Sequence, residues 1–286
     1  MNEQQRSDRL ATLMGRHPVS WSKGGGGYTP AGRWIVEFDN GTTAFAKIGT
    51  TPDTSAWLRV EHRMYSQTDA PWLPGFLGWD DDGNSPILIL EDLSRSHWPP
   101  PWKPGNVDAV LRALDEVSRT TPPEGTPVID TVRMSGWFDV EKNPAEFLNL
   151  GFCTSEWLEE SLPELLDAEA SAPMEGDEFL HLDIRSDNLC FVGDRAVIVD
   201  WNLVCIGNSL LDVAFWLPSL HAEGGPKPEE VSPESGVFAG AISGFFASRA
   251  GQPVIPYAPR VRDVQLQQLG TALPWAARVL GLPLLT

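Results

Sequence analysis

The amide of Asn188 and the carboxylate of Asp200 are spaced so that they could hold a cation together. Between them lie two apolar runs, residues 189–192 and 196–199, on either side of the dipeptide Gly193–Asp194. This pattern is typical of a β-hairpin with a two-residue turn. Because residues pair symmetrically about such a turn, Asn188 stands opposite the residue that precedes Asp200. The sequence therefore predicts the amide and the carboxylate side by side.

An amide oxygen and a carboxylate suit Mg²⁺, which prefers oxygen ligands and completes its shell with water and substrate phosphates. Asp183 precedes Asn188 on the connecting loop and could accept or orient the proton of an attacking hydroxyl group. His181 could brace this loop through hydrogen bonds. These parts match in-line phosphoryl transfer. The alternative is a hairpin whose polar residues only cap turns.

The ordered set His181-x-Asp183-x-x-x-x-Asn188, followed by Asp200, resembles the catalytic and metal-binding loops of the aminoglycoside phosphotransferase and choline kinase family. The fold of that family is similar to that of protein kinases. The resemblance implies that Asp183 is the catalytic base, that Asn188 and Asp200 are the magnesium ligands, and that ATP is the phosphoryl donor.

Three positions depart from the family pattern. The family more often has Gly where Leu182 stands, Asp where Asn208 stands, and Gly or Glu where Asn202 stands. The resemblance is strong over residues 179–217, moderate over residues 33–93 and thin elsewhere. These departures leave the metal-binding set intact but loosen any inference about the acceptor.

Asp212 lies in a segment that resembles the part of the family in which an aspartate steadies the catalytic loop. Ser209 and Asp212 also form the pattern of a capping box at the start of a helix. The two roles are compatible, and neither makes Asp212 a direct catalyst.

Lys47 resembles the strand lysine that contacts the α- and β-phosphates of the nucleotide. Glu61, on the helix that follows, is its expected ion-pair partner. The glycine run Gly24–Gly27 could let backbone N–H groups approach phosphates closely. The alternatives are a solvent-facing lysine and a flexible turn.

The nucleotide and the acceptor each have a further candidate segment. Glu91, Asp92 and Leu93 fall where the family meets adenine through backbone groups, so their side chains are not expected to specify the nucleotide. An acidic helical stretch lies where relatives recognise cationic acceptors, although it also fits a solvated helix face. Its members are Glu156, Glu159, Glu160, Glu164, Asp167 and Glu169.

The first third of the chain reads as a small β-rich lobe. Strands are predicted at residues 33–38 and 43–48, joined by a tight turn, and at residues 86–90. A helix is predicted over residues 54–67. The proline-rich stretch of residues 94–106 then marks a boundary.

The remainder reads as mainly helical. Apolar residues at helical spacing predict a helix over residues 107–117. A second apolar face begins at Trp157, but Pro163 and the capping-box pattern of Ser161 with Glu164 leave open one helix or two. Residues 224–236 read as a loop, and residues 237–249 and 261–280 as helices.

The expected architecture is therefore an α+β, bilobal, protein-kinase-like fold. A nucleotide-binding lobe is predicted at residues 1–93, and a catalytic and acceptor-binding lobe at residues 94–286. The length of 286 residues allows a substantial core in either one or two lobes.

Composition narrows the classes of partner. A net charge of −18 without a basic cluster argues against nucleic acid, and no apolar run is long enough to span a membrane. The start of the chain has no signal-peptide core, so a cytoplasmic protein is expected. Three cysteines without paired spacing favour buried thiols over disulfides or a zinc site.

These observations predict an ATP- and Mg²⁺-dependent kinase that phosphorylates a hydroxyl group of a small molecule. An aminoglycoside or amino sugar is the first expectation for the acceptor, which could be cationic, and choline-like compounds or sugar alcohols come next. A nucleotide-binding pseudokinase with a regulatory role is the alternative. A protein kinase fits less well because only eleven residues separate Asp200 from Asp212. The oligomeric state stays open.

Overall fold

The computed structural model describes residues 2–285, which divide into two compact units. Unit 1 holds the described residues up to Pro99, together with Pro123–Gly125 and Asp187–Asn202. Unit 2 holds Pro100–Pro122, Thr126–Ser186 and the described residues from Leu203 onward. Most of the hairpin segment predicted to bind the metal thus belongs to the same unit as the first third of the chain.

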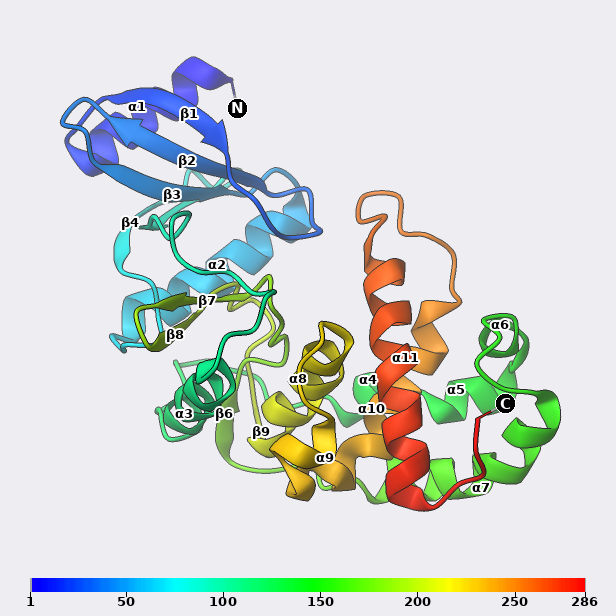
Figure 1. Ribbon diagram of the computed structural model, residues 1–286. Coiled ribbons are helices and arrows are strands. Elements are labelled where there is room, and N and C mark those ends of the chain that lie inside the picture. The colour runs from blue at the N-terminus through cyan, green and yellow to red at the C-terminus, as the bar shows by residue number, and fades with distance from the viewer. Residues whose placement is uncertain (1, 286) are drawn as a thin grey trace. The chain divides into compact units, whose positions relative to one another are not determined.

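Unit 1 is built on a five-stranded antiparallel sheet with strand order β1-β2-β3-β5-β4 (Figure 1). The strands at residues 33–38, 43–48 and 86–90 were predicted, and β1 and β4 were not. The bounds are β1 Pro18–Lys23, β2 Gly32–Phe38, β3 Thr43–Ile48, β4 Phe76–Asp80 and β5 Ile87–Glu91. The residue set at 39–42 closes the β2–β3 hairpin, where Gly41 has a φ of 79°.

Two helices of unit 1 contact opposite faces of this sheet. Helix α1 (Glu3–Met14) places Leu10 in a core cluster with alternate residues of β3, including Ala44 and Ala46. Because side chains alternate across a strand, Lys47 of β3 points to the other face. There it meets Glu61 of α2 (Pro52–Gln67). The helix predicted at residues 54–67 is confirmed, and it delivers a carboxylate to Lys47.

The predicted hairpin is present, with β7 at Leu189–Val192 and β8 at Arg195–Ile198. Its register pairs Leu189 with Ile198 and Val192 with Arg195, symmetrically about the turn, as predicted. The hairpin is held in unit 1 by reciprocal backbone hydrogen bonds between His97 and Phe191, at 3.2 and 2.8 Å. Cys190 and Val197 add a small apolar cluster with Leu93.

Unit 2 is mainly helical and includes one two-stranded pair, β6 with β9 (Figure 1). The helix predicted at residues 107–117 is confirmed as α3. The bounds are α3 Asn106–Ser118, α4 Thr131–Met134, α5 Trp137–Lys142, α6 Ala145–Leu148, α7 Ser155–Ser171, β6 Glu178–Leu180, β9 Cys205–Gly207, α8 Leu210–Ala222, α9 Pro228–Val231, η1 Pro233–Phe238, α10 Ala239–Ala250 and α11 Val261–Leu280.

Helix α7 answers whether the stretch around Pro163 forms one helix or two. It is a single helix, and Pro163 lies inside it with an exposed ring. The side chain of Thr154, not that of Ser161, caps its start by accepting the N–H of Trp157 at 3.2 Å. Burial of Leu158 and Leu165 on one side keeps the helix continuous across the missing proline N–H. The stretch predicted as a loop at residues 224–236 also contains the short helix α9 and the start of η1.

Helix α10 packs very closely against its neighbours through small residues. A Cβ atom added at Gly244 would lie 2.5 Å from Oε2 of Glu169, and one added at Gly240 would lie 2.6 Å from the Cβ of Ala168. Glu169 is buried and accepts the N–H groups of Gly136 and Trp137 at 2.6 and 2.9 Å, so it caps the start of α5. Glycine is needed at these two positions because the neighbouring residues pack too closely for a Cβ atom, not because the backbone needs an unusual φ.

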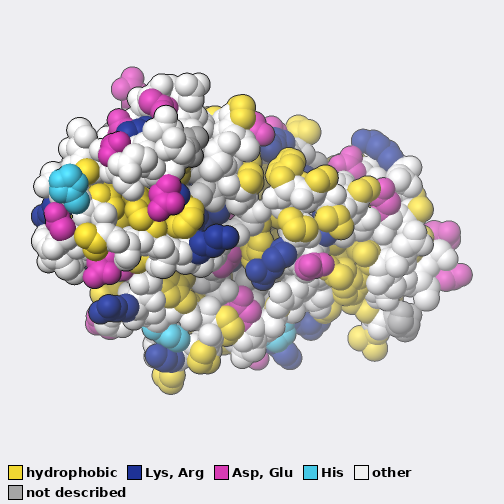
Figure 2. All heavy atoms as spheres, turned by 90° about the horizontal axis from the view of Figure 1, so that it is seen from above, with side chains coloured by type: hydrophobic (Ala, Val, Ile, Leu, Met, Phe, Trp, Pro, Cys, Tyr) yellow, Lys and Arg dark blue, Asp and Glu magenta, His cyan; other side chains and the backbone are white. Residues whose placement is uncertain are grey.

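Two further observations concern the described chain, residues 2–285. No helix in it has both the length and the apolar content needed to cross a bilayer. Cys153, Cys190 and Cys205 are buried free thiols. On the face drawn in Figure 2, acidic and basic side chains are interspersed with apolar ones.

Candidate active site

Lys47 is the centre of an ion-pair network inside unit 1. Its Nζ atom lies 2.5 Å from Oε1 of Glu61 and 2.6 Å from Oδ1 of Asp200. The predicted ion pair with Glu61 is therefore present, and Asp200 joins it from a position 153 residues away in sequence. Both Lys47 and Glu61 are buried, at 6% and 1% exposure. The solvent-facing alternative for Lys47 is excluded.

The charges of this network depend on one another. Burial alone would lower the pKa of Lys47, but the carboxylates of Asp200 and Glu61 outweigh it and raise the pKa above its ordinary value. Burial raises the pKa of Glu61 to about 7, although Lys47 acts in the opposite direction. Lys47 therefore stays charged, and this charge is what makes a buried Glu61 carboxylate tolerable.

Asn188 and Asp200 lie at the open end of the β7–β8 hairpin. The N–H of Val199 donates to the carbonyl of Asn188 at 2.8 Å, which extends the ladder by one pair and leaves Asp200 directly beyond it. The backbone of Asp200 has a φ of 70°, so the chain turns sharply at this residue. Trp201 is fully buried, with its ring centroid 4.9 Å from that of Trp72, and anchors the turn.

The donor set of this hairpin end fits Mg²⁺. It offers one amide oxygen and one carboxylate, and Mg²⁺ commonly takes one or two protein oxygens and fills its shell with phosphates and water. Among residues 2–285, no group of three or more His, Cys, Asp or Glu side chains is arranged to hold a metal. A cation held by Asn188 and Asp200 would thus depend on the substrate for further ligands.

The glycine run lies between β1 and β2 and turns back toward this hairpin. Gly26 and Gly27 have φ values of 80° and 70°, which side-chain-bearing residues rarely adopt. A Cβ atom added at Gly26 would lie 3.8 Å from the carbonyl oxygen of Asp187, the residue before Asn188. Unit 1 therefore brings the glycine run, Lys47 and the hairpin end into one region.

In unit 2, Asp212 holds the segment that carries Asp183. Its carboxylate accepts the N–H of His181 at 2.8 Å and the N–H of Leu182 at 2.6 Å. The predicted capping box is wrong, because Ser209 makes no side-chain cap and Asp212 is directed to a distant loop instead. Burial raises the pKa of Asp212 to about 7, although the two N–H donors act to lower it.

Asp183 is fixed by neighbours on both sides. Its N–H donates to Nδ1 of His181 at 3.1 Å, so Nδ1 acts as an acceptor in this contact. One carboxylate oxygen of Asp183 lies 2.6 Å from Nη1 of Arg185. The end of the loop is held by Ser186, whose hydroxyl group donates to Glu223 beyond α8. The expectation that His181 braces the loop matches this geometry.

The predicted adenine segment begins at Glu91, the last residue of β5. The N–H of Glu91 donates to the carbonyl of Gly75, and its carboxylate accepts the N–H of Gly75 in return. Burial acts to raise the pKa of Asp92, but hydrogen bonds from Ser94 hold it below its ordinary value. The carbonyl of Leu93 accepts the indole N–H of Trp98 at 2.9 Å and the N–H of Ser96 at 3.0 Å. Both lone pairs of that carbonyl are therefore occupied within the chain.

Solved structures named for small-molecule kinases and phosphotransferases share this architecture over almost the whole chain. A choline/ethanolamine kinase family protein from Mesorhizobium loti aligns over 98% of both chains, with a TM-score of 0.65 and 15% identity. Spectinomycin phosphotransferase APH(9)-Ia, in complex with ADP and spectinomycin, aligns over 98% of both chains with a TM-score of 0.61 and 11% identity. The chain has the protein-kinase-like fold.

A third solved structure with this fold is a macrolide 2'-phosphotransferase type I. The alignment covers 98% of this chain and 97% of that chain, with a TM-score of 0.53 and 15% identity. No family model matches the sequence. No curated protein matches it either. The predicted resemblance to aminoglycoside phosphotransferases and choline kinases is thus confirmed at the level of the fold.

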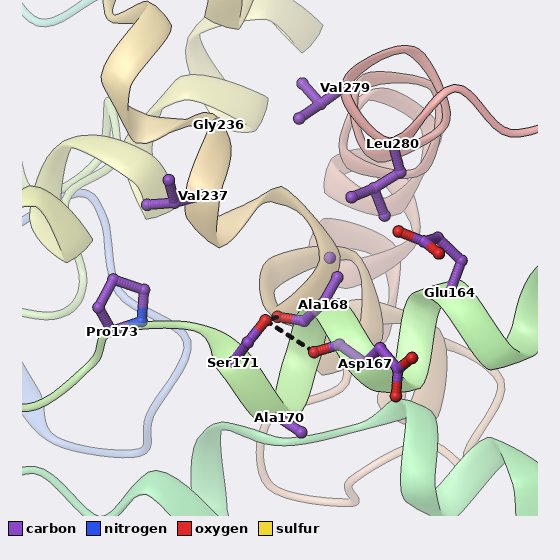
Figure 3. A pocket seen from close by; sticks show the side chains of 11 residues that line it. Glu164, Asp167, Ala168, Ala170, Ser171, Pro173, Gly236, Val237, Val279 and Leu280 are labelled. Atoms are coloured by element: carbon purple, nitrogen blue, oxygen red, sulfur yellow. Dashed lines mark hydrogen bonds between the residues drawn. The ribbon is translucent and has the colours of Figure 1, made fainter.

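The acidic residues predicted for acceptor recognition lie in different environments along α7. Glu156, Glu159 and Glu160 are exposed, whereas Glu169 is buried as the cap of α5. Glu164 and Asp167 line an open groove of about 760 Å³, whose apolar lining includes Val237, Val279 and Leu280 (Figure 3). Burial raises the pKa of Glu169. Its commitment to α5 makes it unsuited to bind an acceptor.

Three residues of the site were not predicted. Arg185 stands inside the recognised motif, and its position two residues after Asp183 is the signal that could have found it. Arg33 faces Lys47 across the β2–β3 pair, which the hairpin register alone implies. Glu223 had no sequence signal, because its contact with Ser186 depends on the length of α8.

Proposed function

We propose that this protein transfers the γ-phosphoryl group of ATP to a hydroxyl group of a small molecule, with Mg²⁺ as the cofactor. The observation that carries the proposal is the convergence, inside unit 1, of Lys47 from the sheet, Glu61 from α2 and Asp200 from the end of the hairpin. A purely structural hairpin would not need a buried lysine fixed by two carboxylates from such distant parts of the chain.

In this proposal Lys47 contacts the phosphates of the nucleotide, and Glu61 keeps its ammonium group in place. Asn188 and Asp200 would hold Mg²⁺, which neutralises phosphate charge when bound. The backbone groups of the Glu91–Leu93 segment would meet adenine, except for the Leu93 carbonyl, which is already used by Ser96 and Trp98.

Asp183 is proposed as the base that accepts or orients the proton of the attacking hydroxyl group. It precedes Asn188 by only five residues, and five residues span at most about 18 Å even when fully extended. Its backbone is fixed through His181, and its carboxylate is oriented by Arg185. A side chain held in one orientation is what general-base catalysis requires.

For the acceptor we propose an aminoglycoside or amino sugar, with choline-like compounds and sugar alcohols as the next classes. Support comes from the net charge of −18, which favours a cationic ligand, and from structural neighbours named for spectinomycin, macrolides and choline. Glu164 and Asp167 of α7 are the proposed acidic residues for recognition of a cationic acceptor. Glu169 is not one of them, because its carboxylate caps α5.

The test is turnover of Mg·ATP with a panel of hydroxylated metabolites and antibiotics, comparing the native chain with Asp183→Ala. Acceptor-dependent ADP release by the native chain, and its loss in the variant, is the expected result. Thermal stabilisation by ATP without turnover across the panel would instead identify a nucleotide-binding pseudokinase.

A further inference from the structure

Arg33 places a second positive charge beside Lys47. The two residues are direct partners in the β2–β3 register, so their side chains lie on the same face of the sheet. Like charges at directly opposed positions destabilise a sheet unless other charges compensate them. The positive charge of Arg33 acts to lower the pKa of Lys47 and that of Glu61, although burial and the carboxylates around them leave both raised.

The guanidinium group of Arg33 is bound by the segment of residues 24–31, called here the glycine-rich loop. Nη1 donates to the carbonyls of Thr29 and Ala31 at 3.1 and 3.2 Å, and Nη2 donates to the hydroxyl group of Thr29 at 3.0 Å. The N–H of Gly24 donates to the carbonyl of Arg33 at 3.0 Å. One residue of β2 thus holds both ends of the loop.

The loop is shaped closely around this side chain. A Cβ atom added at Gly27, which has a φ of 70°, would lie 2.3 Å from the guanidinium carbon and would displace the guanidinium group. The neighbouring Gly26 lies toward the carbonyl of Asp187, as described above. Contact with Arg33 therefore fixes the part of the loop that lies nearest to the hairpin end.

We propose that Arg33 is a positioning residue for the nucleotide, which holds the glycine-rich loop in the conformation that binds the phosphates and adds its charge to that of Lys47. Carbonyl oxygens repel phosphate, and the guanidinium compensates two of them, those of Thr29 and Ala31. The planar fork of arginine can serve several acceptors at once, which the point charge of a lysine cannot reproduce. This inference rests on the proposed function.

The experiment measures the dissociation constants of Mg·ATP and adenosine by calorimetry for the native chain and for Arg33→Gln, Arg33→Lys and Thr29→Val. Arg33→Gln is expected to weaken ATP binding about tenfold, and Arg33→Lys somewhat less, with adenosine binding within about twofold of the native value. Thr29→Val removes one acceptor and should weaken ATP binding by about threefold even if the Arg33 variants fail to fold. Arg16→Gln is the matched control, because Arg16 is exposed and its guanidinium donates to the hydroxyl group of Thr42 at 3.1 Å.

Native ATP affinity in either Arg33→Gln or Arg33→Lys would overturn the inference, the second because charge alone would then suffice. Equal weakening of ATP and adenosine would also overturn it, since that pattern indicates general damage to unit 1. A native chain that binds neither ligand would contradict the proposed function itself, which separates the two failures.

Discussion

The N–H of Leu182 donates to the carboxylate of Asp212 at 2.6 Å, and Leu182 has a φ of 61°. A left-handed backbone costs a non-glycine residue about 1–2 kcal/mol, so it persists only where other contacts enforce it. Here a buried carboxylate enforces it, one residue before Asp183. A glycine at this position would adopt the same φ without that cost.

Asp212→Asn should change how stability depends on pH. The pKa of Asp212 is about 7 in the folded state and 3.8 in the reference state, so its stabilising contribution is complete below about pH 4 and is lost as pH rises through 7. About three pKa units correspond to roughly 4 kcal/mol. Urea unfolding should therefore show the native chain losing stability relative to Asp212→Asn by up to about that amount between pH 4 and 8. A difference that stays constant over this range contradicts the prediction.

Leu182 offers a test of the left-handed backbone itself. Leu182→Val should lower the free energy of unfolding by about 1–2 kcal/mol, because a β-branched residue is least compatible with positive φ. Leu182→Gly should stay within about 1 kcal/mol of the native chain, since relief of strain offsets the lost side chain. Denaturant unfolding of both variants checks the order, and a more stable valine variant would show that the backbone is not strained there.

The elements governed by local rules were predictable. A two-residue turn at Gly193–Asp194 fixes which residues face each other, so the neighbourhood of Asn188 and Asp200 followed from the sequence. Helix α11 likewise has the bounds expected from its pattern. Helix α1 was missed because Leu10 is its only buried residue, and its apolar pattern is correspondingly weak.

The failures come from contacts between distant residues. Asp212 has the spacing of a helix cap, yet its carboxylate is used 30 residues away by Leu182. Glu169 has the sequence context of an acidic helix face, yet its carboxylate caps α5. Pro163 left open one helix or two, and packing of Leu158 and Leu165 carries α7 through it as one. No local pattern distinguishes these cases, because the partner decides each one.

Removal of Lys47 should lower the free energy of unfolding, because Glu61 is then buried without its cation. Lys47→Met leaves Glu61 without its cation, and breaking such a buried pair costs about 3–5 kcal/mol when the remaining group is charged. Because the pKa of Glu61 is already raised by burial, it can protonate below pH 7, so the loss should be smaller at pH 5 than at pH 8. Unfolding free energies at both pH values test this. The double variant with Glu61→Gln should recover part of the loss, and equal losses at both pH values would count against the prediction.

Two glycines in helices should respond oppositely to alanine. Gly244→Ala should destabilise the protein by about 2–3 kcal/mol, because the new Cβ would meet Glu169 and Trp137 at 2.5 Å. Gly270→Ala in α11 is the matched control, where the nearest atom, on Phe152, lies at 3.6 Å. There helix propensity should raise stability by about 0.5–1 kcal/mol. Thermal unfolding of both variants decides whether close helix packing, rather than glycine flexibility, explains α10.

Arg185→Gln should slow the chemical step without weakening nucleotide binding. Its guanidinium lies 2.6 Å from the carboxylate of Asp183, whereas Lys47 and Asp200 belong to the other unit. Loss of this contact removes one restraint on the orientation of the Asp183 side chain, so kcat should fall by about 10–100-fold while KM for ATP stays within about twofold. Arg185→Lys keeps the charge and should be intermediate. Asp183→Asn should lose about 10²–10⁴-fold in kcat, and adding Arg185→Gln to it should cost little more if the two residues act as one unit. Fully additive losses in the double variant would show that Arg185 acts independently of Asp183.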